Sequence, residues 1–231
     1  MPVRLPLIRR SWLGLLAALA LAGCDTSATP EAGRAPAPPL DAAEAATGPA
    51  PDTLDLRQLG YGRGAPDAPV TVIEFSDFGC PYCGVFALQT YPELAREFVE
   101  TGQVRWQFVP MVLGIFPNGD AAARAAECAG EQDGFWPMHD LLFQTQREWK
   151  GSGDPLSLFT GYAQRLQLDA ERFASCYRED RGRERIRLNN HVAELAGIRA
   201  TPTFLVEGRM VEGALPAEQF RMLLRQVTAG R

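Results

Sequence analysis

The feature that most constrains the fold is a pair of cysteines, Cys80 and Cys83, that directly follows a strongly β-prone segment. Residues 70–77 are rich in β-branched and aromatic side chains, and they are too apolar on both faces for an exposed strand. Residues 81–98 then repeat apolar side chains at helical spacing. The cysteine pair therefore lies where a buried strand is expected to lead into a helix.

This placement predicts redox chemistry. Unpaired N–H groups and the macrodipole at a helix N-terminus favour a thiolate at Cys80. Cys83 follows one turn later, close enough to form a disulfide with Cys80. Pro81 suits the first helical position because its missing N–H would have no partner there. We expect thiol–disulfide exchange in which Cys80 is the attacking thiol and Cys83 resolves the mixed disulfide.

Half of a zinc site is the main alternative, because paired cysteines at this spacing also bind metal. The sequence has no second pair of this kind: Cys128 and Cys176 are isolated, and the histidines are His139 and His191. We therefore expect no metal and no organic cofactor.

The chain resembles the DsbA-like branch of the thioredoxin superfamily, the exported thiol:disulfide oxidoreductases. Three landmarks carry the resemblance in order, namely VTVIEFSDFGCPYC at 70–83, a helical stretch at 121–143 that ends in FWPMHDLLF, and GIRATPTFLV at 197–206. The resemblance runs from about residue 60 to the C-terminus. It implies an α/β thioredoxin fold with an inserted all-helical domain at about 117–200. It also implies a cis peptide bond at Thr201-Pro202, in a loop that faces the cysteine pair and binds substrate.

The periodicity predicts the following elements. A strand is expected at 104–110. Helices are expected at 121–129, with Asn118 as a cap, and at 135–149, 155–166, 170–178 and 183–196. Short strands at 203–206 and 209–212 and a helix at 216–227 complete the fold.

Two residues near the pair are expected to tune it. Glu74 lies on the central strand between apolar neighbours, so burial should raise its pKa and allow it to take the proton of Cys83. Related proteins carry an acid at this place; an exposed Glu at a sheet edge with no role is the alternative. Tyr82 stands where strongly oxidising relatives commonly have a histidine, so we expect a weaker oxidant. The alternative for Tyr82 is a side chain that only shapes the docking surface.

Cys128 and Cys176 remain after the other cysteines are assigned. In an oxidising compartment we expect them to form a structural disulfide within the helical insertion, with two free buried thiols as the alternative.

The N-terminus predicts export. Three arginines precede an apolar segment at 12–22, which is typical of a signal peptide at 1–23, although an N-terminal core helix is the alternative. Leu21-Ala22-Gly23-Cys24 resembles a bacterial lipobox, which implies lipidation at Cys24. Residues 24–52 are rich in proline and alanine and predict a disordered tether, so the folded domain is expected at 53–231.

Charge and composition limit the partners. Without the leader, 20 basic residues stand against 28 acidic ones, a net charge of −8 that argues against nucleic-acid binding. We expect a lipoprotein on the periplasmic side of the bacterial cell envelope that oxidises reduced exported proteins and is reoxidised by a membrane redox partner. Two alternatives stay open: a reductase or isomerase kept reduced by a membrane donor, and a non-enzymatic lipoprotein that holds client proteins.

Overall fold

The computed structural model describes residue 56 and residues 59–230. The predicted signal peptide at 1–23, the lipidation site Cys24 and the tether at 24–52 lie outside the described residues. The part of the chain that is described contains no helix long and apolar enough to span a bilayer.

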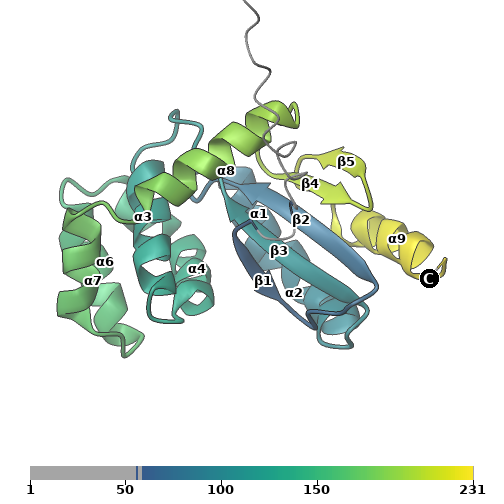
Figure 1. Ribbon diagram of the computed structural model, residues 1–231, viewed down its shortest axis with the longest axis horizontal. Coiled ribbons are helices and arrows are strands. Elements are labelled where there is room, and N and C mark those ends of the chain that lie inside the picture. The colour runs from purple at the N-terminus through teal and green to yellow at the C-terminus, as the bar shows by residue number, and fades with distance from the viewer. Residues whose placement is uncertain (1–55, 57–58, 231) are drawn as a thin grey trace, which may run out of the picture. The chain divides into compact units, whose positions relative to one another are not determined.

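The centre of the fold is a five-stranded sheet with the strand order β1-β3-β2-β4-β5 (Figure 1). Its strands are β1 (Tyr61–Arg63), β2 (Val70–Ser76), β3 (Val104–Pro110), β4 (Thr203–Val206) and β5 (Arg209–Glu212). β2 and β3 run parallel, whereas β1, β4 and β5 each pair antiparallel with a neighbour. The mixed sheet with an inserted helical segment is the predicted α/β thioredoxin fold. β1 was not predicted, because three residues are too few to show alternation.

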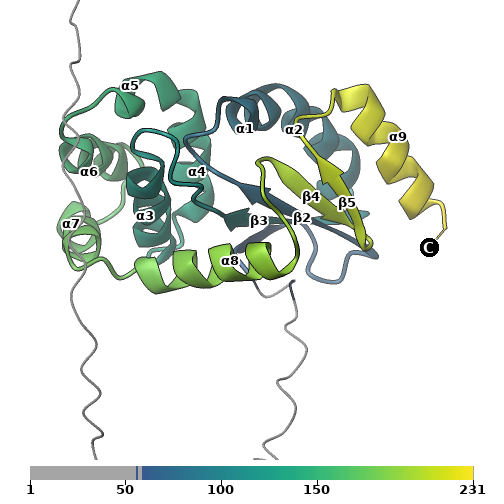
Figure 2. The ribbon, with the colours of Figure 1, turned by 90° about the horizontal axis from the view of Figure 1, so that it is seen from above.

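Helices cover both faces of the sheet, as Figure 2 shows. On one face lie α9 (Ala217–Thr228) and a continuous helical run made of α1 (Pro81–Val85), η2 (Phe86–Thr90), α2 (Tyr91–Leu94) and η3 (Ala95–Val99). In α9, Phe220 and Leu224 are one turn apart and both are buried against this face. On the other face, α8 (Arg183–Leu195) packs through Val192. The central strand is therefore apolar on both sides, as its sequence predicts.

The helical insertion begins with α3 (Gly119–Gly130) and continues in a series of short helices. These are α4 (Phe135–Gln144), α5 (Gln146–Lys150), α6 (Pro155–Arg165) and α7 (Ala170–Arg178), and α8 returns the chain to the sheet. Alanines dominate the buried face of α3, so neighbouring helices can approach it closely. Asp154 and Asp169 cap α6 and α7 by accepting hydrogen bonds from backbone N–H groups.

Two details differ from the predictions. The helix expected at 135–149 is divided at Thr145, which has non-helical backbone angles and separates α4 from α5. Asn118 precedes α3, but its side chain makes no capping hydrogen bond. Its amide donates instead to the carbonyls of Trp149 and Ser152, at 2.7 and 2.9 Å, and so holds the end of α5.

Candidate active site

Cys80 and Cys83 lie at the predicted junction between β2 and α1. Cys80 is the N-cap of α1 and has extended backbone angles, and Pro81 occupies the first helical turn. The carbonyl of Cys80 accepts a hydrogen bond from the N–H of Gly84 at 3.2 Å, which begins the helix. Both cysteines are free thiols in this structure. The sulfur of Cys80 is therefore placed beside the first N–H groups of the helix.

The two thiols differ in acidity although both are buried. A hydrogen bond from Cys83 is the largest influence on Cys80, and with backbone N–H groups of Cys83 and Tyr82 it lowers the pKa of Cys80 to about 6, against the opposing effect of burial. Burial raises the pKa of Cys83 well above its ordinary value, and the neighbouring Cys80 raises it further. At neutral pH the reduced pair is thus a Cys80 thiolate beside a Cys83 thiol.

The loop before β4 faces this pair. The Thr201-Pro202 peptide bond is cis, as the resemblance implies. The sulfur of Cys80 lies 3.3 Å from the Thr201 carbonyl oxygen, to which it donates a hydrogen bond when it is a protonated thiol. The contact joins residues 121 positions apart in the sequence. The geometry brings together the cysteine pair and the loop predicted to bind substrate.

Glu74 is buried on β2, the strand that leads to the cysteine pair. The indole Nε1 of Trp106 donates a hydrogen bond to its Oε2 at 2.8 Å, whereas Oε1 has no hydrogen-bond partner among the described residues. Burial raises the pKa of Glu74, and the hydrogen bond from Trp106 lowers it by less, so that the pKa is about 7. The carboxyl therefore changes protonation near neutral pH, and the alternative of an exposed edge position is wrong.

Four residues around the pair were not predicted. Ser76 lies two positions after Glu74 on the same face of β2, and its hydroxyl lowers the pKa of both Glu74 and Cys83 against the effect of burial. The period of two in the strand could have indicated Ser76. Trp106, Gln146 and Lys150 gave no such signal, because they reach the site from other elements.

Tyr82 projects from the site with 68% of its surface exposed. Val85 and Leu88 are also exposed apolar side chains on the same helical run. The reactive pair is therefore bordered by apolar surface.

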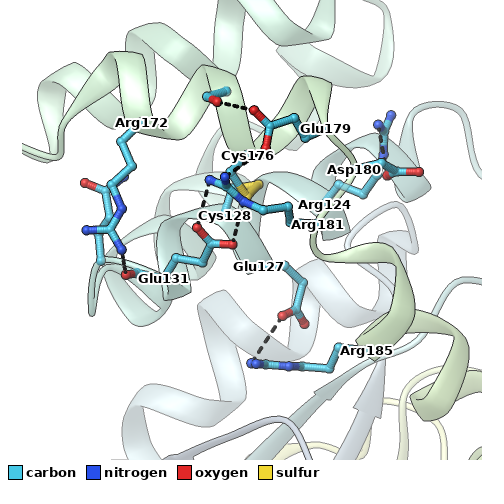
Figure 3. The surroundings of a disulfide bond; sticks show 12 residues. Arg124, Glu127, Cys128, Glu131, Arg172, Cys176, Glu179, Asp180, Arg181 and Arg185 are labelled. Atoms are coloured by element: carbon cyan, nitrogen blue, oxygen red, sulfur yellow. Dashed lines mark hydrogen bonds and ion pairs between the residues drawn. A yellow bond between two sulfur atoms is a disulfide. The ribbon is translucent and has the colours of Figure 1, made fainter.

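Cys128 of α3 and Cys176 of α7 are joined in a disulfide, with their Cα atoms 5.7 Å apart (Figure 3). Both residues are buried. Ion pairs surround the bond: Arg181 contacts Glu131 and Glu179, and Arg185 contacts Glu127. This bond belongs to the helical insertion and is not part of the Cys80–Cys83 centre. Within the residues that the structure describes, no cluster of three or more histidine, cysteine or acidic side chains could hold a metal ion.

Comparison with known proteins identifies the family. The thioredoxin family model matches residues 59–226. A Na⁺/H⁺ antiporter NhaA of Salinispora arenicola is 38% identical over 198 residues, which are 84% of this chain and 29% of that protein. The chain spans between 22% and 29% of the length of this and two further antiporter relatives.

A relative and a solved structure of similar size both come from Bacillus subtilis. Disulfide bond formation protein D of Bacillus subtilis is 28% identical over 179 residues, which cover 73% of this chain and 77% of that protein. The crystal structure of oxidised BdbD from Bacillus subtilis superposes with a TM-score of 0.66 at 25% identity, and the match covers 73% of this chain and 92% of that chain. The match of the family model over residues 59–226 shows that the chain belongs to the thioredoxin family.

Proposed function

We propose that this chain is a thiol:disulfide oxidoreductase, and that it acts as an oxidase which donates the Cys80–Cys83 disulfide to reduced exported proteins. The position of Cys80 as the N-cap of α1, beside backbone N–H groups that lower the pKa of its thiol, is the main support. An acidic Cys80 is a good leaving group and stabilises the reduced enzyme, and both effects favour transfer of the disulfide to a client protein.

The exchange proceeds in two displacements. A client thiolate attacks the sulfur of Cys80, the Cys80–Cys83 bond breaks, and the electron pair leaves on Cys83. Cys83 takes a proton, for which the buried Glu74 is the proposed donor because its pKa of about 7 allows it to hold one. A second client thiolate then attacks the client sulfur of the mixed disulfide and expels the Cys80 thiolate. Two client thiols have become a disulfide, and the enzyme pair carries the two electrons.

The surroundings of Cys80 support docking of an extended client segment. Thr201 and Pro202 precede β4 and lie against Cys80, where backbone groups can pair with a client in the manner of a strand. The exposed Tyr82, Val85 and Leu88 offer apolar contacts that do not depend on client sequence. An enzyme with many clients needs contacts of this general kind.

The N-terminal sequence supports a location in the cell envelope. We propose that residues 1–23 direct export, that Cys24 is lipidated, and that residues 24–52 tether the domain at 53–231 to the periplasmic side of a membrane. A tether of this composition reaches up to roughly 85 Å when extended. The domain could then contact both exported clients and a membrane redox partner that removes its electrons.

The resting redox state of Cys80–Cys83 in cells tests the direction of exchange. Acid quenching followed by alkylation with a maleimide of high mass separates the oxidised from the reduced form on a gel. We expect most of the protein to be oxidised, and the Cys83→Ala variant to accumulate mixed disulfides with clients. A mainly reduced pair in the same cells would contradict the oxidase proposal and support a reductase or isomerase.

Replacement of Cys24 tests the anchor. The Cys24→Ala variant should appear in a soluble or unprocessed form in fractionated cells, whereas the unaltered chain should sediment with membranes. Continued membrane attachment of the variant would overturn the lipoprotein proposal.

A further inference from the structure

The backbone just before the reactive cysteine is held by side chains of the helical insertion. Gln146 Nε2 donates hydrogen bonds to the carbonyls of Phe78 and Cys80, at 2.7 and 2.9 Å. Lys150 Nζ donates to the carbonyl of Gly79 at 2.6 Å. Both donors belong to α5, 66 to 71 residues further along the chain. Three consecutive carbonyls are therefore bound by one short helix of the insertion.

The N–H groups of the same loop are bound to Asp77. The N–H of Gly79 donates to Asp77 Oδ1 at 2.8 Å, and the N–H of Cys80 donates to the Asp77 carbonyl at 3.0 Å. Asp77 is itself buried, and its Oδ2 accepts a hydrogen bond from the N–H of Leu113. The loop thus has its N–H groups bound to Asp77 and its carbonyls bound to α5, which removes its freedom to rotate.

Helix α5 is itself fixed at both ends. Asn118 donates to the Trp149 carbonyl at its C-terminal end, and the indole of Trp149 donates to the Leu142 carbonyl of α4 at 2.7 Å. At the other end, the amide of Gln146 lies against Gly84 of α1, where a Cβ atom would come within 3.4 Å of it. Five residues alone would not form a stable helix. These contacts make α5 a rigid support for the loop.

We infer that Gln146 and Lys150 are positioning residues for Cys80: by holding the carbonyls of residues 78–80, they keep the sulfur of Cys80 at the N-terminus of α1. The inference rests on the proposed role of Cys80 as the reactive thiol. It assigns to the helical insertion a part in setting the redox properties of a centre that lies wholly in the thioredoxin core.

The physical effect follows from the position of the sulfur. Without the two side chains, three carbonyls lose donors and the loop can leave its single conformation. The Cys80 sulfur would then spend less time beside the N–H groups of Tyr82 and Cys83, which stabilise its thiolate. The pKa of Cys80 should rise, and the reduced enzyme should become less favoured relative to the disulfide.

The test uses Gln146→Met, Lys150→Met and the double variant, with Arg147→Met as a matched control. Arg147 lies on the same helix and carries a charge but makes none of the hydrogen bonds to residues 78–80. Thiolate absorbance titration gives the pKa of Cys80, and equilibration with glutathione gives the redox equilibrium constant. We expect a rise of about half a pKa unit in each single variant and about one unit in the double variant, with up to about a tenfold shift in equilibrium toward the disulfide. Arg147→Met should match the unaltered chain.

Further readouts separate positioning from loss of fold. Lys150→Arg keeps an N–H donor and should keep the pKa of Cys80 near that of the unaltered chain. Thermal unfolding shows whether each variant is folded at the titration temperature. If the double variant is unfolded there, the single variants decide the outcome. Suppose that the pKa of Cys80 is low in the unaltered chain and equally low in folded Gln146→Met and Lys150→Met. That result would overturn the positioning inference alone. A Cys80 of ordinary acidity in the unaltered chain would instead overturn the proposed function.

Discussion

The two cysteine pairs of this chain share one buried apolar cluster but differ in the groups beside their sulfurs. Cys80 and Cys83 are three positions apart, they begin a helix, and polar groups of Thr201, Ser76 and the backbone surround their sulfurs. Cys128 and Cys176 are 48 positions apart and join the interiors of two helices, where alanine and aromatic side chains pack around them. Burial is common to both pairs. The contrast teaches that hydrogen bonds to sulfur and helix position, rather than exposure, distinguish an exchanging pair from a structural bond.

The largest effect is expected from removing one sulfur of the pair that we propose to exchange disulfides. Cys80→Ser should reduce disulfide transfer to a reduced client protein to the uncatalysed background, because without the sulfur of Cys80 the enzyme has no disulfide to donate. The free energy of unfolding should change little. Transfer activity can be followed by the recovery of a client enzyme that needs its disulfides. Substantial activity in Cys80→Ser would place the reactive thiol elsewhere.

The opposite result is expected for the second pair. Replacing both Cys128 and Cys176 with alanine should lower the free energy of unfolding by up to ~4 kcal/mol, because the bond closes a loop of 48 residues. The pKa of Cys80 and the transfer rate of the folded variant should match those of the unaltered chain. Urea unfolding measures the first quantity and thiolate titration the second. A large change in Cys80 acidity would show that the two pairs are coupled.

Two buried glutamates extend the comparison, since burial raises the pKa of both Glu74 and Glu127 to about 7. Glu74 lies on β2, six positions before Cys80, and Glu127 directly precedes Cys128. A raised pKa means that the folded state holds the proton more tightly than the unfolded state does. Each glutamate therefore stabilises the fold fully below about pH 4.5, and this stabilisation is lost as pH rises through 7.

The free energy of unfolding of the unaltered chain should therefore fall between pH 5 and 8. In Glu74→Gln this fall should be smaller, by about 3 kcal/mol at most. Glu127→Gln is the matched control and should flatten the same profile. Only Glu74→Gln should slow the step in which Cys83 leaves or attacks, as measured by stopped-flow alkylation and exchange. Equal transfer rates in the two variants would remove Glu74 from the proton-transfer step.

The smallest expected effect concerns Tyr82. Tyr82→His should lower the pKa of Cys80 and make the pair more oxidising, because a protonated imidazole can stabilise the thiolate. The change should stay below about one pKa unit, since residue 82 is mostly exposed and water screens its charge. Glutathione equilibration of both proteins measures the shift. An unchanged equilibrium would mean that Tyr82 acts only on client docking.

The predicted site residues before and within α1 are close together in the sequence. Cys80, Pro81, Cys83 and Glu74 lie within ten residues, so strand and helix periodicity place them relative to one another. The cis-proline loop is 121 positions from Cys80 and was predicted from the family resemblance, not from periodicity.

The missed features depend on contacts between distant segments. The division at Thr145 turns Gln146 and Lys150 toward the Cys80 loop, and the apolar repeat at 135–149 gives no sign of it. Asn118 resembles a cap by residue type, yet its amide is used by carbonyls more than 30 residues away. Local patterns fix the elements, while the side chains that link them follow from packing.

The acidity of Cys80 tests the account most directly. Reduced protein should show a thiolate absorbance change with a midpoint near pH 6 that disappears in Cys80→Ser and is preserved when Cys128 and Cys176 are replaced with alanine. Peptide mapping after brief alkylation at that pH should find the label on Cys80. A titration with no midpoint below about pH 8.5, or labelling of Cys83 before Cys80, would contradict the account.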